Sequence, residues 1–120
     1  MENLKYGDKV FHRNLKMFGT FEGIDQIDRD SAHVTFIDKF DGGEDYRRVS
    51  TNFLVKVIEY KVINDFIGKE KEVKKYDSLY LINSELYSSD FKLVCMLNSE
   101  HERLNCKEVK PNDSSNKNNS

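Results

Sequence analysis

Short segments of alternating hydrophobic and polar residues dominate the first half of the chain. In residues 32–38, Val34 and Phe36 fall on one face of an extended chain, and His33 and Thr35 fall on the other. This period of two residues indicates a strand with one buried face. The segment therefore predicts a half-buried β-strand with Phe36 in the core.

Turn-forming residues separate this segment from others of similar length. The predicted strands cover residues 9–14, 18–28, 32–38, 46–49 and 55–60, with a single helical turn at 50–54. Gly19 and Gly23 interrupt the second strand, where glycine usually marks a bulge or a sharp bend. Five short, bent strands within about fifty residues suffice for a small barrel but not for a sandwich. We therefore predict a closed five-stranded barrel from about Lys5 to Val57.

Five short motifs follow one another in this half of the chain: Gly7-Asp8-Lys9-Val10, Gly19-Thr20-Phe21-Glu22-Gly23-Ile24, His33-Val34-Thr35-Phe36, Arg47-Arg48-Val49 and Asn52-Phe53-Leu54. Their order resembles that of SH3-like barrels of the Tudor and KOW type, in particular the Tudor-like RNA-polymerase-interacting domain of the CarD family. The resemblance implies a fold rather than an activity, because this architecture serves RNA binders, polymerase binders, methyl-residue readers and structural modules. As a whole, the chain is similar to small accessory proteins carried by phages of low-GC Gram-positive bacteria.

The second half of the chain has a weaker pattern. Four apolar residues from Tyr60 to Ile67 have helical spacing, but Gly68 and the charged run after it interrupt the helix. This segment is predicted to be either a short helix or an irregular crossover. Apolar runs at residues 79–82, 91–97 and 105–109 then predict further strands.

Some features of the first half recur in the second. Lys75-Tyr76-Asp77 resembles Lys5-Tyr6-Gly7-Asp8, and the spacing from Ile37 to Val49 recurs from Leu97 to Val109. These repeats fit a degenerate second barrel, whereas an antiparallel extension packed on the first barrel is the simpler arrangement and the one we favour. The predicted chain is mainly β, with an SH3-like barrel over residues 1–60, a β-rich extension or degenerate second barrel over 61–110, and a disordered tail over 111–120.

Composition narrows the possible classes of function. The chain has 19 basic and 21 acidic residues, a net charge of −2, whereas a dedicated duplex-DNA binder usually has a basic domain. It has neither an apolar run of membrane-spanning length nor the hydrophobic segment of a signal peptide, so we expect a cytoplasmic protein with no membrane partner. Cys95 and Cys106 are too few to staple a chain of this size, and we expect both to be reduced.

The sequence contains no motif that indicates catalysis or a cofactor. Cys95, His101 and Cys106 are the one cluster of metal-ligating residue types, and their spacing matches none of the short zinc-binding arrangements. There is no nucleophile elbow and no phosphate-binding glycine loop. His12 and His33 fall in predicted strands as surface residues. We therefore expect no catalytic residue, no metal and no cofactor, and predict that the protein is not an enzyme.

Acidic and aromatic residues at the predicted hairpin tips are the leading candidates for a binding site. The acidic residues gather around the two long turns, and Phe40 and Tyr46 flank the second of these. Charged tips are usually just solvated, but a negative face also steers a basic protein toward it. We therefore hypothesise docking on a host protein, such as polymerase or a defence nuclease. The predicted contact residues are Glu22, Asp25, Asp38, Phe40, Asp41, Glu44, Asp45 and Tyr46.

The alternative hypothesis is nucleic-acid binding through basic residues of the barrel. Arginine has a planar, forked side chain that suits phosphate. The same residues also fit ordinary surface pairing with nearby carboxylates such as Glu44 and Asp45. The candidates for contact with nucleic acid are Arg13, Lys16, Arg47 and Arg48.

Overall fold

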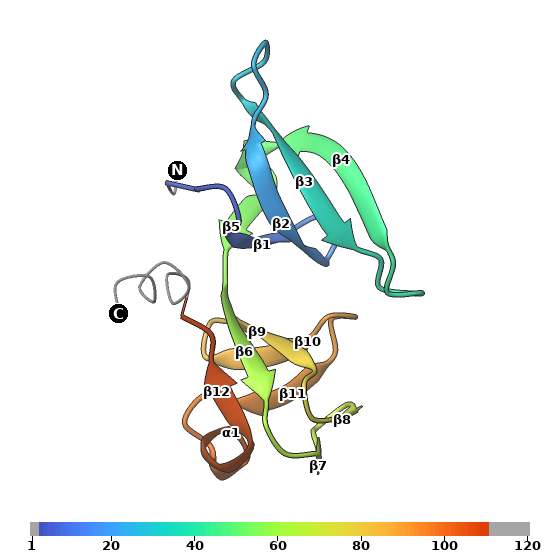
Figure 1. Ribbon diagram of the computed structural model, residues 1–120, viewed down its shortest axis with the longest axis vertical. Coiled ribbons are helices and arrows are strands. Elements are labelled where there is room, and N and C mark those ends of the chain that lie inside the picture. Colours follow the sequence, from blue (N-terminus) through green and yellow to red (C-terminus); the bar gives the residue numbers. More distant parts are fainter. Residues whose placement is uncertain (1–2, 111–120) are drawn as a thin grey trace, which may run out of the picture.

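Two five-stranded antiparallel sheets, one from each half of the chain, form most of the computed structural model, which describes residues 3–110 (Figure 1). The first sheet lies above the second in this view, and the chain passes from one to the other at Val57. The prediction of a mainly β fold is confirmed. Between residues 3 and 110, no helix is long and apolar enough to cross a membrane. The predicted disordered tail at 111–120 lies outside the described residues.

The first sheet curls because its second strand is bent. The elements of this sheet are β1 (Lys9–His12), β2 (Met17–Ile24), β3 (Ser31–Ile37), β4 (Glu44–Ser50), the 3-10 helix η1 (Thr51–Phe53) and β5 (Leu54–Lys56). Their order in the sheet is β4-β3-β2-β1-β5. The register of β2 on β3 shifts between Phe21 and Gly23, where Gly23 has a φ of 144°. A bulge of this kind increases the local twist and bends the strand.

This half of the fold matches the predicted strands, with two differences. The predicted strand at 55–60 is divided, since Leu54–Lys56 pairs with β1 whereas Ile58–Val62 begins the second sheet. Val57, the residue between them, is buried in the cluster that joins the two sheets. The sheet is also a half-barrel rather than the closed barrel predicted, because β4 and β5 are the two ends of its hydrogen-bonded order.

The second sheet has the same strand order as the first. The elements of this half are β6 (Ile58–Val62), the small hairpin of β7 (Phe66–Ile67) and β8 (Glu72–Val73), then β9 (Ser78–Ile82), β10 (Glu85–Ser88), β11 (Leu93–Met96), α1 (Glu100–Asn105) and β12 (Cys106–Glu108). The order of this sheet is β11-β10-β9-β6-β12. When its five strands are numbered 1 to 5 along the chain, this order is 4-3-2-1-5, which is also the order of the first sheet. A helical element also precedes the last strand in both. The two halves thus share one strand order, whereas the division into two domains stays a prediction.

Two expectations for this half were incomplete. The apolar spacing before Gly68 does not produce a helix, because the chain reverses there into the β7–β8 hairpin, closed by the N–H of Gly68 and the carbonyl of Lys71 at 2.9 Å. The strand β10 and the helix α1 were not predicted. Ser99 caps α1 by accepting the N–H of Glu102 at 3.3 Å, an arrangement typical of helix N-termini.

The turns before β1 and β9 share their hydrogen bonds, as the sequence repeat indicated. The N–H of Lys5 donates to Oδ2 of Asp8 at 2.8 Å, and that of Lys74 donates to Oδ2 of Asp77 at 2.9 Å. Each aspartate N–H donates back to the lysine carbonyl at 3.0 Å. By strand order, however, β9 corresponds to β2 and not to β1. The repeat is therefore one of local turn structure.

Aromatic rings join the two sheets. Each sheet has its own apolar cluster, and a third cluster combines Phe11, Phe18 and Val57 with Tyr80 of β9. The ring centroid of Phe18 lies 4.9 Å from that of Phe11 and 4.5 Å from that of Tyr80. Phe91 also stacks on Phe11, with centroids 5.2 Å apart, and lies 6.2 Å from Phe18. The halves of the chain thus share a core.

Candidate functional site

The turn between β3 and β4, residues 38–43, is here called the β3–β4 tip, and its own carboxylates hold it in shape. Oδ1 of Asp38 accepts the N–H groups of Phe40 at 2.8 Å and of Asp41 at 3.2 Å. Oδ1 of Asp41 in turn accepts the N–H of Gly43 at 2.8 Å. Aspartate side chains commonly fix turns in this way. The backbone of the tip is thus preorganised.

The tip presents Phe40 to solvent. This side chain is 89% exposed, whereas Phe18 and Phe36 of the same half are fully buried. The ammonium of Lys39 donates to the carbonyl of Leu15 at 3.2 Å and so anchors the tip to the turn between β1 and β2. The prediction that Phe40 is exposed is confirmed. An aromatic side chain on a fixed loop can enter a cavity of a partner with little further loss of entropy.

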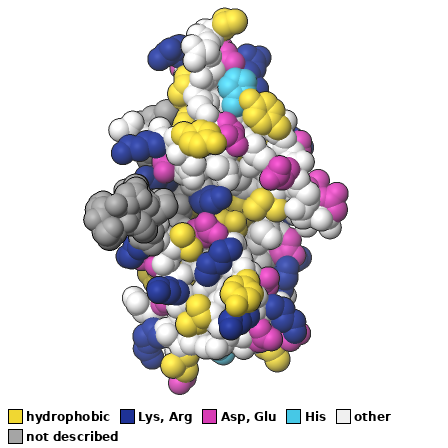
Figure 2. Space-filling view, viewed as in Figure 1, with side chains coloured by type: hydrophobic (Ala, Val, Ile, Leu, Met, Phe, Trp, Pro, Cys, Tyr) yellow, Lys and Arg dark blue, Asp and Glu magenta, His cyan; other side chains and the backbone are white. Residues whose placement is uncertain are grey.

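Acidic residues flank Phe40 in the chain, with Asp38 before it and Asp41 and Glu44 after it. Figure 2 shows acidic side chains at the edge of the molecule where Figure 1 places the β3–β4 tip. The carboxylate of Asp45 is paired with Arg47, because its Oδ2 lies 2.8 Å from both Nε and Nη2 of the guanidinium. Glu44, at the start of β4, is exposed. The tip therefore combines one apolar anchor with a negative rim.

Tyr46 lies on the outer face of the first sheet and not at the tip. The β3–β4 register places Tyr46 opposite Thr35 and Arg48 opposite His33, so these four side chains share one face. The Tyr46 ring, 63% exposed, stacks on the His33 ring with centroids 5.7 Å apart. Asp25 fixes the His33 ring by accepting its Nε2–H at 2.8 Å.

Asp25 serves mainly to hold the turn between β2 and β3. Its Oδ2 accepts the N–H of Ile27 at 3.1 Å and that of Asp28 at 2.8 Å. The N–H of Asp28 and the imidazole of His33 hold the pKa of Asp25 below its usual value. The hydroxyl of Ser31 donates to Asp28 at 2.8 Å and not to His33, so the Asp25–His33 pair orients side chains and does not activate a serine.

The predicted acidic residues do not form a single face. The turn between β2 and β3 lies at one end of β3, and the β3–β4 tip lies at the other end (Figure 1). Glu22 accepts the hydroxyl of Thr35 at 2.9 Å and, like Asp25, belongs to the outer face of the sheet. Sequence reasoning missed Ile27, which is 93% exposed in the turn between β2 and β3. An apolar residue alone in a charged turn was the available signal.

The four basic residues predicted to contact nucleic acid also lie on different parts of the first sheet. Arg47 and Arg48 are consecutive in β4 and therefore point to opposite faces. Arg48 lies 3.7 Å from Asp25 on the outer face, whereas Arg47 binds Asp45 on the other side. The guanidinium of Arg13 donates to the carbonyl of Asn52, and Lys16 is exposed in the turn between β1 and β2. The fold does not bring all four together.

His12 is buried, contrary to the predicted surface position. Its Nδ1 accepts the N–H groups of Asn14 at 3.2 Å and of Leu15 at 3.0 Å, and its ring stacks on Phe53 at 5.2 Å between centroids. Burial lowers the pKa of His12, as do the positive charges of Arg47 and Arg13, although a backbone hydrogen bond opposes the shift. The neutral ring is thus the form that the fold requires.

Mild acid is therefore expected to destabilise the protein through His12. Because the pKa is lower in the folded state than in the unfolded chain, the stabilising contribution is complete above the unfolded value of about 6.5 and is lost as the pH falls through the folded value. The urea midpoint should decrease between about pH 7.5 and about pH 5.5. In His12→Asn, whose side-chain oxygen can replace Nδ1 as acceptor, this decrease should be smaller. An equal decrease in both proteins would contradict the assignment.

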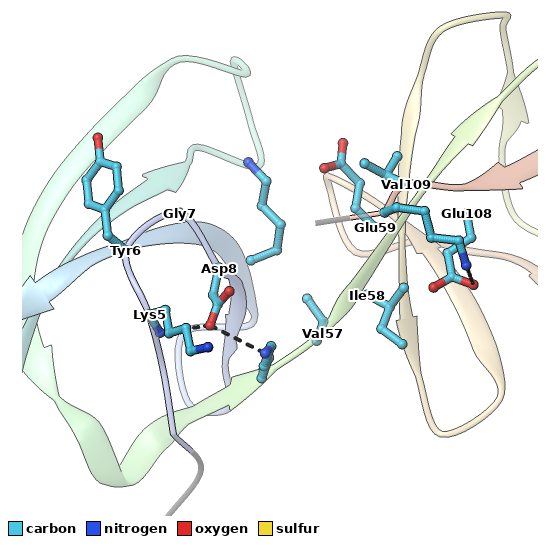
Figure 3. A pocket seen from close by; sticks show the side chains of 12 residues that line it. Lys5, Tyr6, Gly7, Asp8, Val57, Ile58, Glu59, Glu108 and Val109 are labelled. Atoms are coloured by element: carbon cyan, nitrogen blue, oxygen red, sulfur yellow. Dashed lines mark hydrogen bonds and ion pairs between the residues drawn. The ribbon is translucent and has the colours of Figure 1, made fainter. Parts of the chain in front are cut away.

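A pocket of about 570 Å³ lies between the two sheets. Its walls are the turn before β1, the link from β5 to β6, and the end of β12 (Figure 3). Asp8 within it is 3.5 Å from Lys56, and Glu108 is 3.5 Å from Lys110. These two ion pairs place charges of both signs on the walls of the pocket. This arrangement favours a structural crevice over a site selective for a charged ligand.

Metal-binding geometry is missing from the described part of the chain. Among residues 3–110, no three His, Cys, Asp or Glu side chains are grouped so that they could hold a metal ion. Cys95 and Cys106 are buried, and His101 stacks on Phe66 with centroids 5.6 Å apart.

Comparison with known proteins identifies no relative of this chain. No protein-family model matches the sequence, and neither a curated protein nor a solved structure matches it. The Tudor, KOW and phage resemblances therefore stand on the sequence motifs alone, and the function is inferred from the geometry of this chain.

Proposed function

We propose that the protein is a non-enzymatic binding module that docks on another protein through the β3–β4 tip. The observation that supports this most is the 89% exposure of Phe40 on a turn whose N–H groups are already bound by Asp38 and Asp41. Large aromatic side chains at the centre of an interface often contribute most of its binding energy. A fixed turn reduces the entropy lost when such a side chain is ordered.

The chemistry of the tip defines the partner. Phe40 requires an apolar cavity, and the negative charges of Asp38, Asp41 and Glu44 favour a basic rim around that cavity. Complementary charge mainly accelerates association and excludes wrong partners. The phage resemblance makes the polymerase and the defence nucleases of a bacterial host the first proteins to test.

Binding is expected to depend on Phe40 itself. With an immobilised partner purified by pull-down, Phe40→Ala should weaken binding by at least about 30-fold, the effect of a hot-spot residue worth about 2 kcal/mol. Glu44→Lys should mainly slow association, and Glu44 is preferable to Asp38 or Asp41 because those two hold the turn. Tyr76→Ala removes an exposed aromatic ring from the second half and is the matched control. Equal loss in Phe40→Ala and Tyr76→Ala would contradict the proposal.

Nucleic-acid binding is the second candidate. One observation favours it: the positive charges of Arg13 and Arg47 both act on His12, so two of the four basic candidates lie near the same side chain. This function predicts an affinity that falls steeply with salt. Nuclease treatment of the pull-down distinguishes the candidates, because a protein partner held by Phe40 would survive it.

A further inference from the structure

The two ends of the second sheet meet at its cysteines. Cys95 is in β11 and Cys106 begins β12, and these strands are the opposite ends of the five-stranded order. In a flat sheet, four strand spacings of about 4.8 Å would hold them about 19 Å apart. Instead, both side chains are buried in one apolar cluster, and each thiol has the largest single effect on the pKa of the other. The second sheet is therefore curled, so that its two end strands share one core.

Within the chain, each of the two thiols can form a disulfide only with the other. They are the only cysteines of the chain, and both are free and buried. The helix α1 connects the two strands. Local opening is nevertheless possible at β12, an edge strand whose ladder to β6 has three residue pairs, because short edge elements open at a low free-energy cost. A small oxidant can reach the thiols through such opening.

We propose that Cys95 and Cys106 form a reversible intramolecular disulfide that fastens the two edges of the second sheet together. The oxidant is a low-molecular-weight disulfide such as oxidised glutathione. The sulfur of Cys95, as thiolate, attacks one sulfur of the oxidant, forms a mixed disulfide and releases one molecule of reduced thiol. Cys106 then loses its proton and attacks Cys95, which releases the second reduced thiol. Two protein thiols are oxidised and one small disulfide is reduced.

The roles of the two cysteines follow from their effect on each other. The neighbouring Cys106 lowers the pKa of the Cys95 thiol, whereas the neighbouring Cys95, together with burial, raises the pKa of the Cys106 thiol. The more acidic thiol is the better first nucleophile at neutral pH. The bond would attach β12 covalently to β11, and with it the adjoining Glu108 and Val109 of the pocket between the sheets.

The test is oxidation of the folded chain. After incubation with oxidised glutathione, alkylation in denaturant and intact-mass measurement, we expect loss of both free thiols with no retained glutathione, and recovery of both after dithiothreitol. The melting temperature of the oxidised protein should rise by about 5–10 °C, because the bond restricts the unfolded chain. The rise is limited because the loop that the bond closes is short. Cys95→Ser and Cys106→Ala should show no such rise.

Three results would overturn the proposal. The first is two thiols that stay free under conditions in which the denatured chain oxidises. The second is two separate glutathione adducts on one chain. The third is an internal disulfide that lowers the melting temperature, which would mean that the folded geometry does not accommodate it. None of these results bears on binding by Phe40, which lies in the other half of the chain.

Discussion

Replacing Phe18 with alanine is expected to lower the free energy of unfolding by about 3–5 kcal/mol. The Phe18 side chain is fully buried and stacks on Tyr80 of the second sheet with centroids 4.5 Å apart. Truncation would leave a cavity where the two halves meet. Urea unfolding followed by circular dichroism measures the change.

Phe40→Ala is the matched control for this prediction, because it removes the same side chain from an exposed position. Its effect on stability should stay within about 0.5 kcal/mol, as for most surface substitutions. If Phe18→Ala were as mild as the control, the shared core between the sheets would be wrong. A biphasic unfolding curve for Phe18→Ala alone would instead mean that the halves separate before each unfolds.

Replacing Gly19 with alanine is expected to cost about 1–3 kcal/mol. A Cβ at this position would lie 2.7 Å from the carbonyl oxygen of Thr35 and 2.9 Å from Cγ1 of Val34. Because the closest atom belongs to the backbone of β3, relief would require the β2 and β3 strands to move apart. The same unfolding assay applies.

Thr20→Ala, one residue along the same strand, is the control for Gly19. It loses the hydrogen bond from Lys9 Nζ at 2.9 Å, which is partly exposed and should contribute about 1 kcal/mol or less. A Gly19→Ala protein as stable as the wild type would show that β2 and β3 can move apart freely, which would contradict their close approach at Gly19.

The sequence predicted the first sheet well because its strands have one buried and one exposed face. Residues 32–38 alternate cleanly, and the structure has β3 at Ser31–Ile37. The division of the predicted strand 55–60 at Val57 was missed because Val57 resembles its neighbours in the strand and no glycine or proline marks the change. The helix α1 was missed although Ser99 and Glu102 have the spacing of a capping box, since its six residues are too short for a clear helical period.

The candidate site was predictable in part. The acidic turn around Phe40 could be read from composition alone, because aspartate, glycine and an isolated aromatic residue are clear turn signals. The register of β4 on β3 places Tyr46 and Arg48 beside Thr35 and His33, and no local pattern gives this register. Alternation along β4 separates Tyr46 from Asp45 and Arg47 from Arg48. The burial of His12 depends on Phe53, 41 residues away in the chain, which no local pattern reveals.

Site-specific photo-cross-linking is the direct test of whether Phe40 contacts a protein partner. A photoreactive phenylalanine analogue placed at position 40 changes a side chain that is already exposed, and the same analogue at position 76 reports on the other half. Docking through the β3–β4 tip predicts covalent capture of one protein partner from position 40 and none from position 76. Capture from position 76 alone, equal capture from both, or no protein adduct from position 40 would contradict it.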